Sequence, residues 1–146
     1  MNSDHQKRIR RAFTQESIFF VRLRTDGFEI DGQAYSELAG RILKTVLIRK
    51  LFEDGAMVCQ SKDGQTAENG TACDACNNPR CKPILRIQLA EQNLRYLVDL
   101  NASSAHNLFA LEDRLQADAR SLADTHVKLT VRSHGHWGEV LFQLLP

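Results

Sequence analysis

The four cysteines are the residues whose types and spacing most clearly indicate chemistry. They stand at Cys59, Cys73, Cys76 and Cys81 with the spacing C-x13-C-x2-C-x4-C, so all of the cysteines fall within 23 residues. A Cys-x-x-Cys pair lets two thiolates from one tight loop meet a single ion. Four thiolates close a tetrahedral zinc site and leave no position for water. Residues 59–83 are therefore predicted to form a zinc loop in which Zn²⁺ is structural.

Other uses of these cysteines stay open from the sequence. An iron–sulfur cluster also takes four thiolates, and disulfides or free thiols are further alternatives. The absence of a readable secretory signal at the N-terminus counts against disulfides. A catalytic zinc is not expected, since catalytic sites usually keep an open position and use histidine or carboxylate ligands. The segment is rich in polar turn-forming residues, so the metal would supply order that apolar burial cannot.

A second set of residues has the types that a single-stranded nucleic-acid site needs. Such a site combines a basic groove with flat side chains on which bases stack. The candidates lie on polar faces of expected strands or in a hairpin loop, and they are Phe20, Arg22, Arg24, Arg49, Arg86, Arg95, Lys128, Arg132 and Trp137. Phe20 shares the parity of Arg22 and Arg24, so these three are expected to project from one face. The alternatives are a core position for Phe20, a barrel-end position for Trp137 and plain solvated faces for the arginines.

The charges are balanced over the whole chain but not locally. The formal net charge is +1, yet residues 1–50 hold ten basic and six acidic side chains, whereas residues 51–146 hold nine and twelve. A basic surface attracts phosphates, and that attraction weakens with salt. His134 and His136 flank Gly135 and are interpreted as a polar hairpin tip rather than a second metal site. The sequence has no glycine-rich phosphate loop and no catalytic-triad or zinc-protease motif, so no enzymatic activity is expected.

The elements that must position these residues are mostly strands. Period-two alternation and β-branched runs predict a hairpin of 18–24 with 28–30 and further strands at 44–52, 84–89, 94–100, 127–132 and 139–144. Residues 36–43 are ambiguous because Gly40 interrupts a helix-like spacing. One helix is expected after a serine cap at Ser103 or Ser104, with leucines at three- and four-residue steps from Leu108 to Leu122.

This order predicts a mostly β protein with one α-helix. A helix between the third and fourth core strands favours an OB-like small barrel, with an N-terminal hairpin and the zinc loop as an insertion. A length of 146 residues suits one domain. We therefore expect a basic flexible arm at 1–14 and a single OB-like domain at 15–146 that contains the zinc loop.

Several short motifs together resemble a known group from about Ile18 to Leu145. They read Gly27-Phe28, Asp31-Gly32, Val46-Leu47-Ile48, Cys59-Gln60-Ser61-Lys62-Asp63-Gly64, Cys73-Asp74-Ala75-Cys76, Cys81, Arg86 and Ser104-Ala105-His106-Asn107. In these motifs the chain resembles single-stranded-DNA-binding-like small proteins of phages and related mobile elements. The resemblance implies an OB-type fold, a zinc held by the four cysteines and binding to single-stranded DNA.

Two functional hypotheses follow. The first is a non-catalytic, phage or mobile-element type protein that binds single-stranded DNA and is stabilised by zinc. Its partners would include a second copy of the chain or a replication or recombination protein. The second is a zinc-stabilised structural or adaptor protein that binds a protein partner. The apolar runs are far shorter than the ~20 residues of a membrane span, so a cytoplasmic protein without membrane contact is expected.

Overall fold

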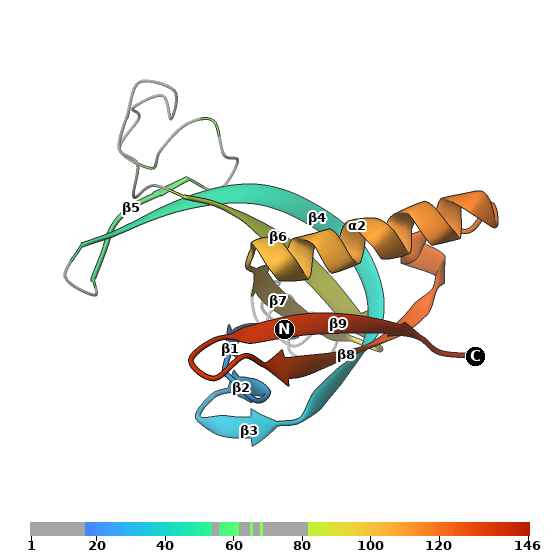
Figure 1. Cartoon of the computed structure of the whole chain (residues 1–146), viewed down its shortest axis with the longest axis horizontal. Helices are drawn as coiled ribbons and strands as arrows, with labels where there is room; N and C mark the ends of the chain where they lie inside the picture. The colour runs from blue at the N-terminus through green and yellow to red at the C-terminus, as the bar shows by residue number, and fades with distance from the viewer. Residues whose placement is uncertain (1–16, 54–55, 62–64, 66–67, 69–81) are drawn as a thin grey trace, which may run out of the picture.

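The computed structural model describes residues 17–53, 56–61, 65, 68 and 82–146 (Figure 1). The strands in this part are β1 (Ser17–Leu23), β2 (Phe28–Ile30), β3 (Gln33–Tyr35), β4 (Glu37–Glu53), β5 (Ala56–Ser61), β6 (Lys82–Glu91), β7 (Leu94–Leu100), β8 (His126–Ser133) and β9 (Gly138–Leu144). The helices are α2 (Ala102–Ala117) and the short 3₁₀ helix η2 (Leu122–Asp124). The predicted mostly β fold with one α-helix is confirmed for the described residues.

All of these strands belong to one strongly curled sheet. The strand order is β3-β2-β1-β7-β6-β4-β8-β9, and β5 pairs with the far end of β4. The strands pair antiparallel except for β1 and β7, which run parallel. Figure 1 shows β4 as a long arch, with α2 crossing the half-barrel and the β8–β9 hairpin below it. The predicted N-terminal hairpin is therefore present and extends into a third short strand.

The curl of β4 has a local cause. The register with β6 shifts between Ile42 and Lys44, and such a bulge bends a strand and increases its twist. Gly40 has φ +157°, and a Cβ there would collide with the backbone carbonyl of Ala90. Glycine thus permits a close approach of β4 and β6 at the bend. Residues 37–43 of the ambiguous segment 36–43 are consequently strand, because Gly40 serves the sheet rather than weakening a helix.

Alternate residues of the strands fill one core. The inward side chains of the central strands are fully buried, as are leucines of α2 at three- and four-residue spacing: Ile87, Leu89, Val98, Leu100, Val127, Leu129, Leu108, Leu111 and Leu115. Side chains of a strand alternate between faces, so the residues between the buried ones lie on the opposite side of the sheet. That opposite side holds most of the residues predicted to bind nucleic acid.

The start of α2 differs from its prediction. The N-cap is Asn101, whose Oδ1 accepts a hydrogen bond from the Ser104 backbone N–H at 3.1 Å. The expected cap at Ser103 or Ser104 is wrong, since both serines lie inside the first turn. Asparagine and serine cap helices about equally well, so local sequence could not choose between them. Ser104 is fully buried and has a different role, described below.

Two further boundaries differ from prediction. β5 occupies the start of the 59–83 segment that was predicted to be a loop, and Leu122 belongs to η2 rather than to the main helix.

No helix among the described residues is long and apolar enough to cross a membrane.

Candidate nucleic-acid interface

The side of the sheet opposite the core carries a continuous mixed surface over β1, β7, β6 and β4. Strand pairing places Phe20 beside Leu97, Leu97 beside Gln88, and Gln88 beside Lys44. We call this surface the outer face and define it by Ile18, Phe20, Arg22, Lys44, Val46, Ile48, Lys50, Arg86, Gln88, Arg95, Leu97 and Asp99. It therefore combines apolar, aromatic and basic side chains from four adjacent strands.

A hollow of about 230 Å³ lies in the outer face. Its apolar lining includes Val46, Ile48 and Leu97, and the cationic side chains of Lys44 and Arg86 also line it. Apolar surface beside cations suits a ligand that is flat and apolar in one part and anionic in another. A nucleotide has this composition, with a base that stacks and a phosphate that pairs with cations.

Phe20 is the most exposed aromatic side chain on the outer face. It keeps 68% of its surface in contact with solvent, so the core alternative for this residue is wrong. The Arg86 guanidinium carbon lies 5.7 Å from the centre of the Phe20 ring, which is within cation–π range. An exposed ring beside a guanidinium offers a base a stacking surface and offers its phosphate a positive charge.

Asp99 moderates the positive charge of this surface. Its Oδ1 lies 2.7 Å from Arg86 Nε, and its Oδ2 lies 2.6 Å from Lys50 Nζ and 3.1 Å from Arg86 Nη2. Burial by itself would raise the pKa of Asp99, but hydrogen bonds from Arg86 and Lys50, and their charges, hold it below its ordinary value. Arg86, Lys50 and Asp99 together therefore carry a net charge of +1.

Arg22 and Arg24, at the end of β1, are both exposed. The basic residues on and near the outer face differ in the groups they contact. Arg24 forms an ion pair with Glu29 at 2.9 Å. Arg22 has no ion-pair partner among the described residues, and the same holds for Lys44 within the described ranges. Arg95 is half-buried and donates to the backbone carbonyls of Gln92 and Leu94, each at 2.9 Å. Arg22 and Lys44 are therefore the cations most available to a phosphate.

Three of the predicted basic residues on strands lie away from the outer face. Arg49 alternates with Ile48 and Lys50, so it projects from the other side of β4, where its buried Nε has no hydrogen-bond partner in the described part of the chain. Lys128 and Arg132 belong to β8, which β4 separates from β6. The structure does not bring these three together with Phe20, because sequence alternation alone cannot tell which strands become neighbours.

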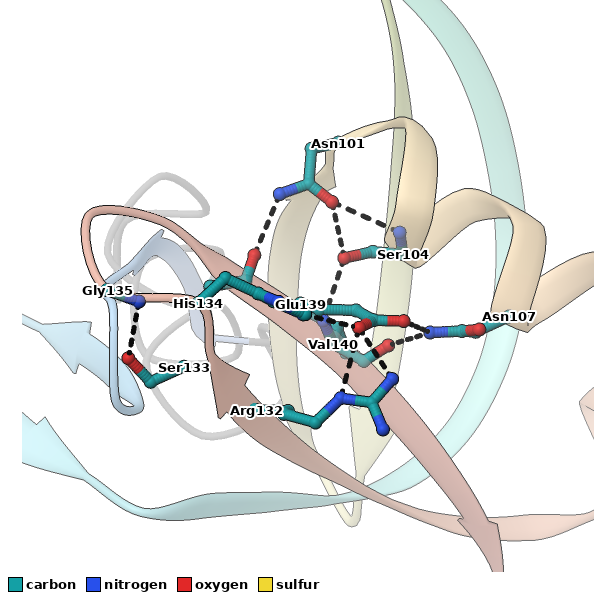
Figure 2. Close-up of polar contacts among 10 residues, drawn as sticks. Asn101, Ser104, Asn107, Arg132, Ser133, His134, Gly135, Glu139 and Val140 are labelled. Atoms are coloured by element: carbon teal, nitrogen blue, oxygen red, sulfur yellow. Dashed lines mark hydrogen bonds and ion pairs between the residues drawn. The ribbon is translucent and has the colours of Figure 1, made fainter.

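Arg132 instead belongs to a polar cluster around the buried Glu139, which sequence reasoning missed (Figure 2). Its centre is Glu139, which accepts hydrogen bonds from Asn107 Nδ2 and Arg132 Nη2, each at 2.8 Å, and lies 2.8 Å from His134 Nε2. The hydrogen bond from Asn107, then those from Arg132 and His134, lower the pKa of Glu139 to about 2. The cluster joins α2 to both strands of the β8–β9 hairpin.

A second set of contacts fixes the start of α2 on the same hairpin (Figure 2). Ser104 Oγ donates to Asn101 Oδ1 at 2.6 Å and accepts from the Val140 backbone N–H at 2.8 Å. Asn101 Nδ2 donates to the carbonyl of Gly138 at 2.8 Å. A Cβ on Gly138 would collide with the carbonyl of Arg24, so the end of β1 also approaches here. Ser104 and Asn107, noted in the sequence as a motif, are therefore structural.

Trp137 lies in the β8–β9 loop rather than on the outer face. Its ring stacks on His134, with 4.1 Å between ring centres and 9° between planes, and the side chain is half-buried. His134 is in turn bonded to Glu139. One face of the indole is therefore covered by a residue that is itself held in place, which leaves at most the other face for a base.

The predicted zinc ligands lie mostly outside the described residues. Cys59 is half-buried on β5, and its backbone pairs with that of Leu51 on β4. Cys73, Cys76 and Cys81 are outside the described ranges. Within those ranges no group of three or more histidine, cysteine or acidic side chains is placed to hold a metal ion.

Comparison of the chain with protein-family models, curated proteins and solved structures finds no match.

Proposed function

We propose that this protein binds single-stranded DNA through the outer face, with little sequence preference and without catalysis. The observation that carries the proposal is the pairing of the exposed Phe20 ring with the Arg86 guanidinium, which lines a hollow together with Lys44. Bases of any sequence can stack on an aromatic ring, and phosphates can pair with the neighbouring cations. Phage-type single-stranded-DNA-binding-like proteins, which the sequence motifs resemble, would share this function.

The strand order supports an OB-like interpretation of the fold. The strands β4, β6 and β7 form a meander, α2 follows, and the β8–β9 hairpin returns to pair with β4. An OB fold likewise places its helix between the third and fourth strands of a five-stranded barrel, and it binds oligonucleotides on the face of strands two and three. In this correspondence β6 and β7 are strands two and three, and they supply Arg86 and Leu97 to the outer face.

The proposed site predicts moderate affinity per subunit. Phe20 is its main stacking platform, and Asp99 offsets part of the charge of Arg86 and Lys50. Each phosphate neutralised on a single strand contributes about −0.7 to the slope of log affinity against log salt. A site with few available cations should therefore show a shallow but measurable salt dependence.

The deciding experiment is fluorescence anisotropy with a labelled single strand of ~30 nucleotides at two salt concentrations, with duplex as competitor. Loss of one stacked base typically costs about 1–3 kcal/mol, so Phe20→Ala should weaken binding by at least about five-fold. Phe109→Ala is the matched control, because Phe109 is also an exposed phenylalanine, at 45%, but lies on α2. Equal affinities of these two variants would contradict the proposed face.

Charge reversal tests the same face independently. Arg22→Glu combined with Lys44→Glu should weaken binding and flatten its salt dependence, because both side chains are available cations on the outer face. Arg114→Glu, an exposed arginine on α2, should leave both quantities unchanged. A similar loss of affinity in both variants would indicate only a general charge effect.

We further propose that the four cysteines hold one structural zinc. Cys59 pairs with Leu51 of β4, and Lys82, which directly follows Cys81 in the chain, pairs with Lys50 of β4. The two ends of the cysteine segment are thus attached to opposite edges of β4 at the same level. Four thiolates fit the ligand set of a closed zinc site, and metal binding would then contribute to folding.

The zinc proposal has a direct test. Elemental analysis should find about one zinc per chain, and Cys73→Ser with Cys76→Ser should lower the midpoint of thermal unfolding. The control is Ser103→Ala, a conservative change on α2. Iron in place of zinc, or an unchanged midpoint in the double variant, would contradict a structural zinc.

A protein-binding adaptor is the second candidate. The observation that favours it is the exposure of large apolar side chains on the outer face, including Ile18 at 56% and Phe20 at 68%. Contiguous exposed apolar surface commonly marks a protein interface. The anisotropy experiment separates the two candidates, since an adaptor would show no salt-sensitive binding to the oligonucleotide.

A further inference from the structure

A second and larger cavity, of about 450 Å³, lies on the core-facing side of β1. Its lining comes from both ends of the curled sheet: Phe19 of β1, Tyr35 of β3, Glu37 of β4, Glu91 of β6, Tyr96 of β7 and His126 of β8. We call it the aromatic pocket. A volume of this size is in the range of small-molecule sites, and the outer-face proposal makes no use of it.

Three aromatic rings supply walls of the aromatic pocket. Phe19 and Tyr96 stack with 5.9 Å between ring centres. Tyr35 is 40% exposed, and its hydroxyl donates to Gln33 Oε1 at 3.3 Å. Aromatic faces are electron-rich and attract cations within about 6 Å of the ring centre. The walls therefore favour a ligand that is both apolar and positively charged.

Carboxylates around the aromatic pocket also favour a positively charged ligand. Asp31, Glu37 and Glu91 all line it, and His126 is the one basic side chain in its lining. Glu91 lies 3.1 Å from His126 Nε2, and Glu37 lies 3.7 Å from Lys128 Nζ. Asp31 has no ion-pair partner among the described residues.

The surroundings of Tyr96 raise the pKa of its hydroxyl. Burial is the largest cause, and the nearby Tyr35 and Glu91 add to it.

We propose that the aromatic pocket binds an organic cation: an alkylammonium or alkylguanidinium group on an apolar stem, of the size of a lysine or arginine side chain. The stem would lie against Phe19 and Tyr96, and the charged group would reach Tyr35 and the carboxylates. The pocket is the electrostatic opposite of the outer face, where cations surround an exposed ring. Phe19 and Phe20 are consecutive, so alternation sends one ring to each site.

The test is isothermal titration calorimetry of the full chain with N-acetyl-argininamide and with N-acetyl-citrullinamide. Citrulline has nearly the same shape but no charge, so only the arginine compound should bind. Equal affinities for the two compounds, or no binding of either at millimolar concentration, would overturn the proposal. A Gly-Arg-Gly peptide distinguishes the sources of the cation: tighter binding than argininamide indicates a peptide, and equal binding indicates a free small molecule.

Substitutions in the lining test whether argininamide binds in the aromatic pocket. Tyr35→Ala should weaken argininamide binding by about two- to five-fold, as expected for loss of one exposed cation–π contact. Glu91→Gln should weaken it by a similar or smaller factor. Phe109→Ala and Asp113→Asn on α2 are the matched controls and should have no effect. Phe20→Ala should leave argininamide binding intact, so this proposal and the DNA-binding proposal can fail separately. Unchanged affinity in both Tyr35→Ala and Glu91→Gln would place any binding elsewhere.

Discussion

Asp99 and Glu139 are both strand carboxylates held by basic side chains, yet they serve different parts of the molecule. The partners of Asp99, Arg86 and Lys50, come from neighbouring strands of one sheet face. Glu139 is contacted by Asn107 of α2 as well as by residues of the β8–β9 hairpin. Asp99 therefore adjusts the charge of a surface, whereas Glu139 connects two elements of the fold.

The two carboxylates also differ in how far they are exposed to solvent. The Asp99 side chain is 25% exposed and that of Glu139 is 10% exposed. Both pKa values are lowered, that of Glu139 to about 2. The carboxylate of Asp99 is more open to water than that of Glu139, and a charge that water can solvate contributes less to stability. A buried hydrogen-bonding group costs more when its partner is removed. The comparison predicts that changes around Glu139 affect folding, and changes at Asp99 affect binding.

The largest effect on stability is expected at Ser104. Ser104→Ala leaves the buried Val140 N–H without its acceptor and removes one donor to Asn101. An unpaired buried group costs about 1–3 kcal/mol, and urea unfolding should show a loss of that size. Ser103→Ala is the control and should lose much less. A loss below 0.5 kcal/mol, roughly the scale of a surface substitution, would show that the junction tolerates an unpaired group.

The next largest effect is expected on the pH dependence of stability, to which Glu139 and Asp99 both contribute. Because folding lowers the pKa of Glu139 from its ordinary 4.5 to about 2, its contribution is present above pH 4.5 and is lost as the pH falls toward 2. Asp99 contributes in the same direction, from its ordinary 3.8 downward. Stability measured between pH 6 and 2.5 should therefore fall less steeply in Glu139→Gln than in the unmodified protein. An identical slope would mean that the Glu139 cluster is not formed in solution.

The smallest effect on stability and a gain in binding are expected at Asp99. Asp99→Asn removes the carboxylate that offsets Arg86 and Lys50, so single-stranded DNA should bind more tightly and with a steeper salt dependence. The stability loss should stay below about 1 kcal/mol, as for other partly exposed ion pairs. Anisotropy and urea unfolding measure the two quantities. Glu139→Gln is the control, since it should leave the salt slope unchanged. Weaker binding by Asp99→Asn would mean that Asp99 orients Arg86 rather than restraining its charge.

Much of the strand pattern could be predicted because alternation is local. The buried Val21 and the exposed Phe20 and Arg22 follow directly from period two. Gly40 was misleading, since its absent side chain matters only where β4 meets Ala90. Local sequence shows that a residue is small, but not which distant backbone approaches it.

The candidate site could be predicted only in part for the same reason. Arg86 and Arg132 look alike in sequence, both being basic residues on polar strand faces. The structure places Arg86 beside Phe20 and Arg132 beside Glu139. Glu139 itself has no sequence signal of burial, because its partners come from α2 and from the far side of a hairpin. Neighbours across strands decide the role of a charge, and period two does not specify them.

The parallel pairing of β1 with β7 also has a consequence for the order of folding. Ser17 pairs with Leu94, and the backbone pairing of β1 with β2 is limited to Arg22 and Leu23. At ~5–20 residues per second, β1 would wait roughly 4–15 s during synthesis for its main partner. Such a non-local pairing forms late and is a natural first point of local opening. Because β1 carries both Phe19 and Phe20, detachment of this one strand would dismantle the aromatic pocket and the outer face together.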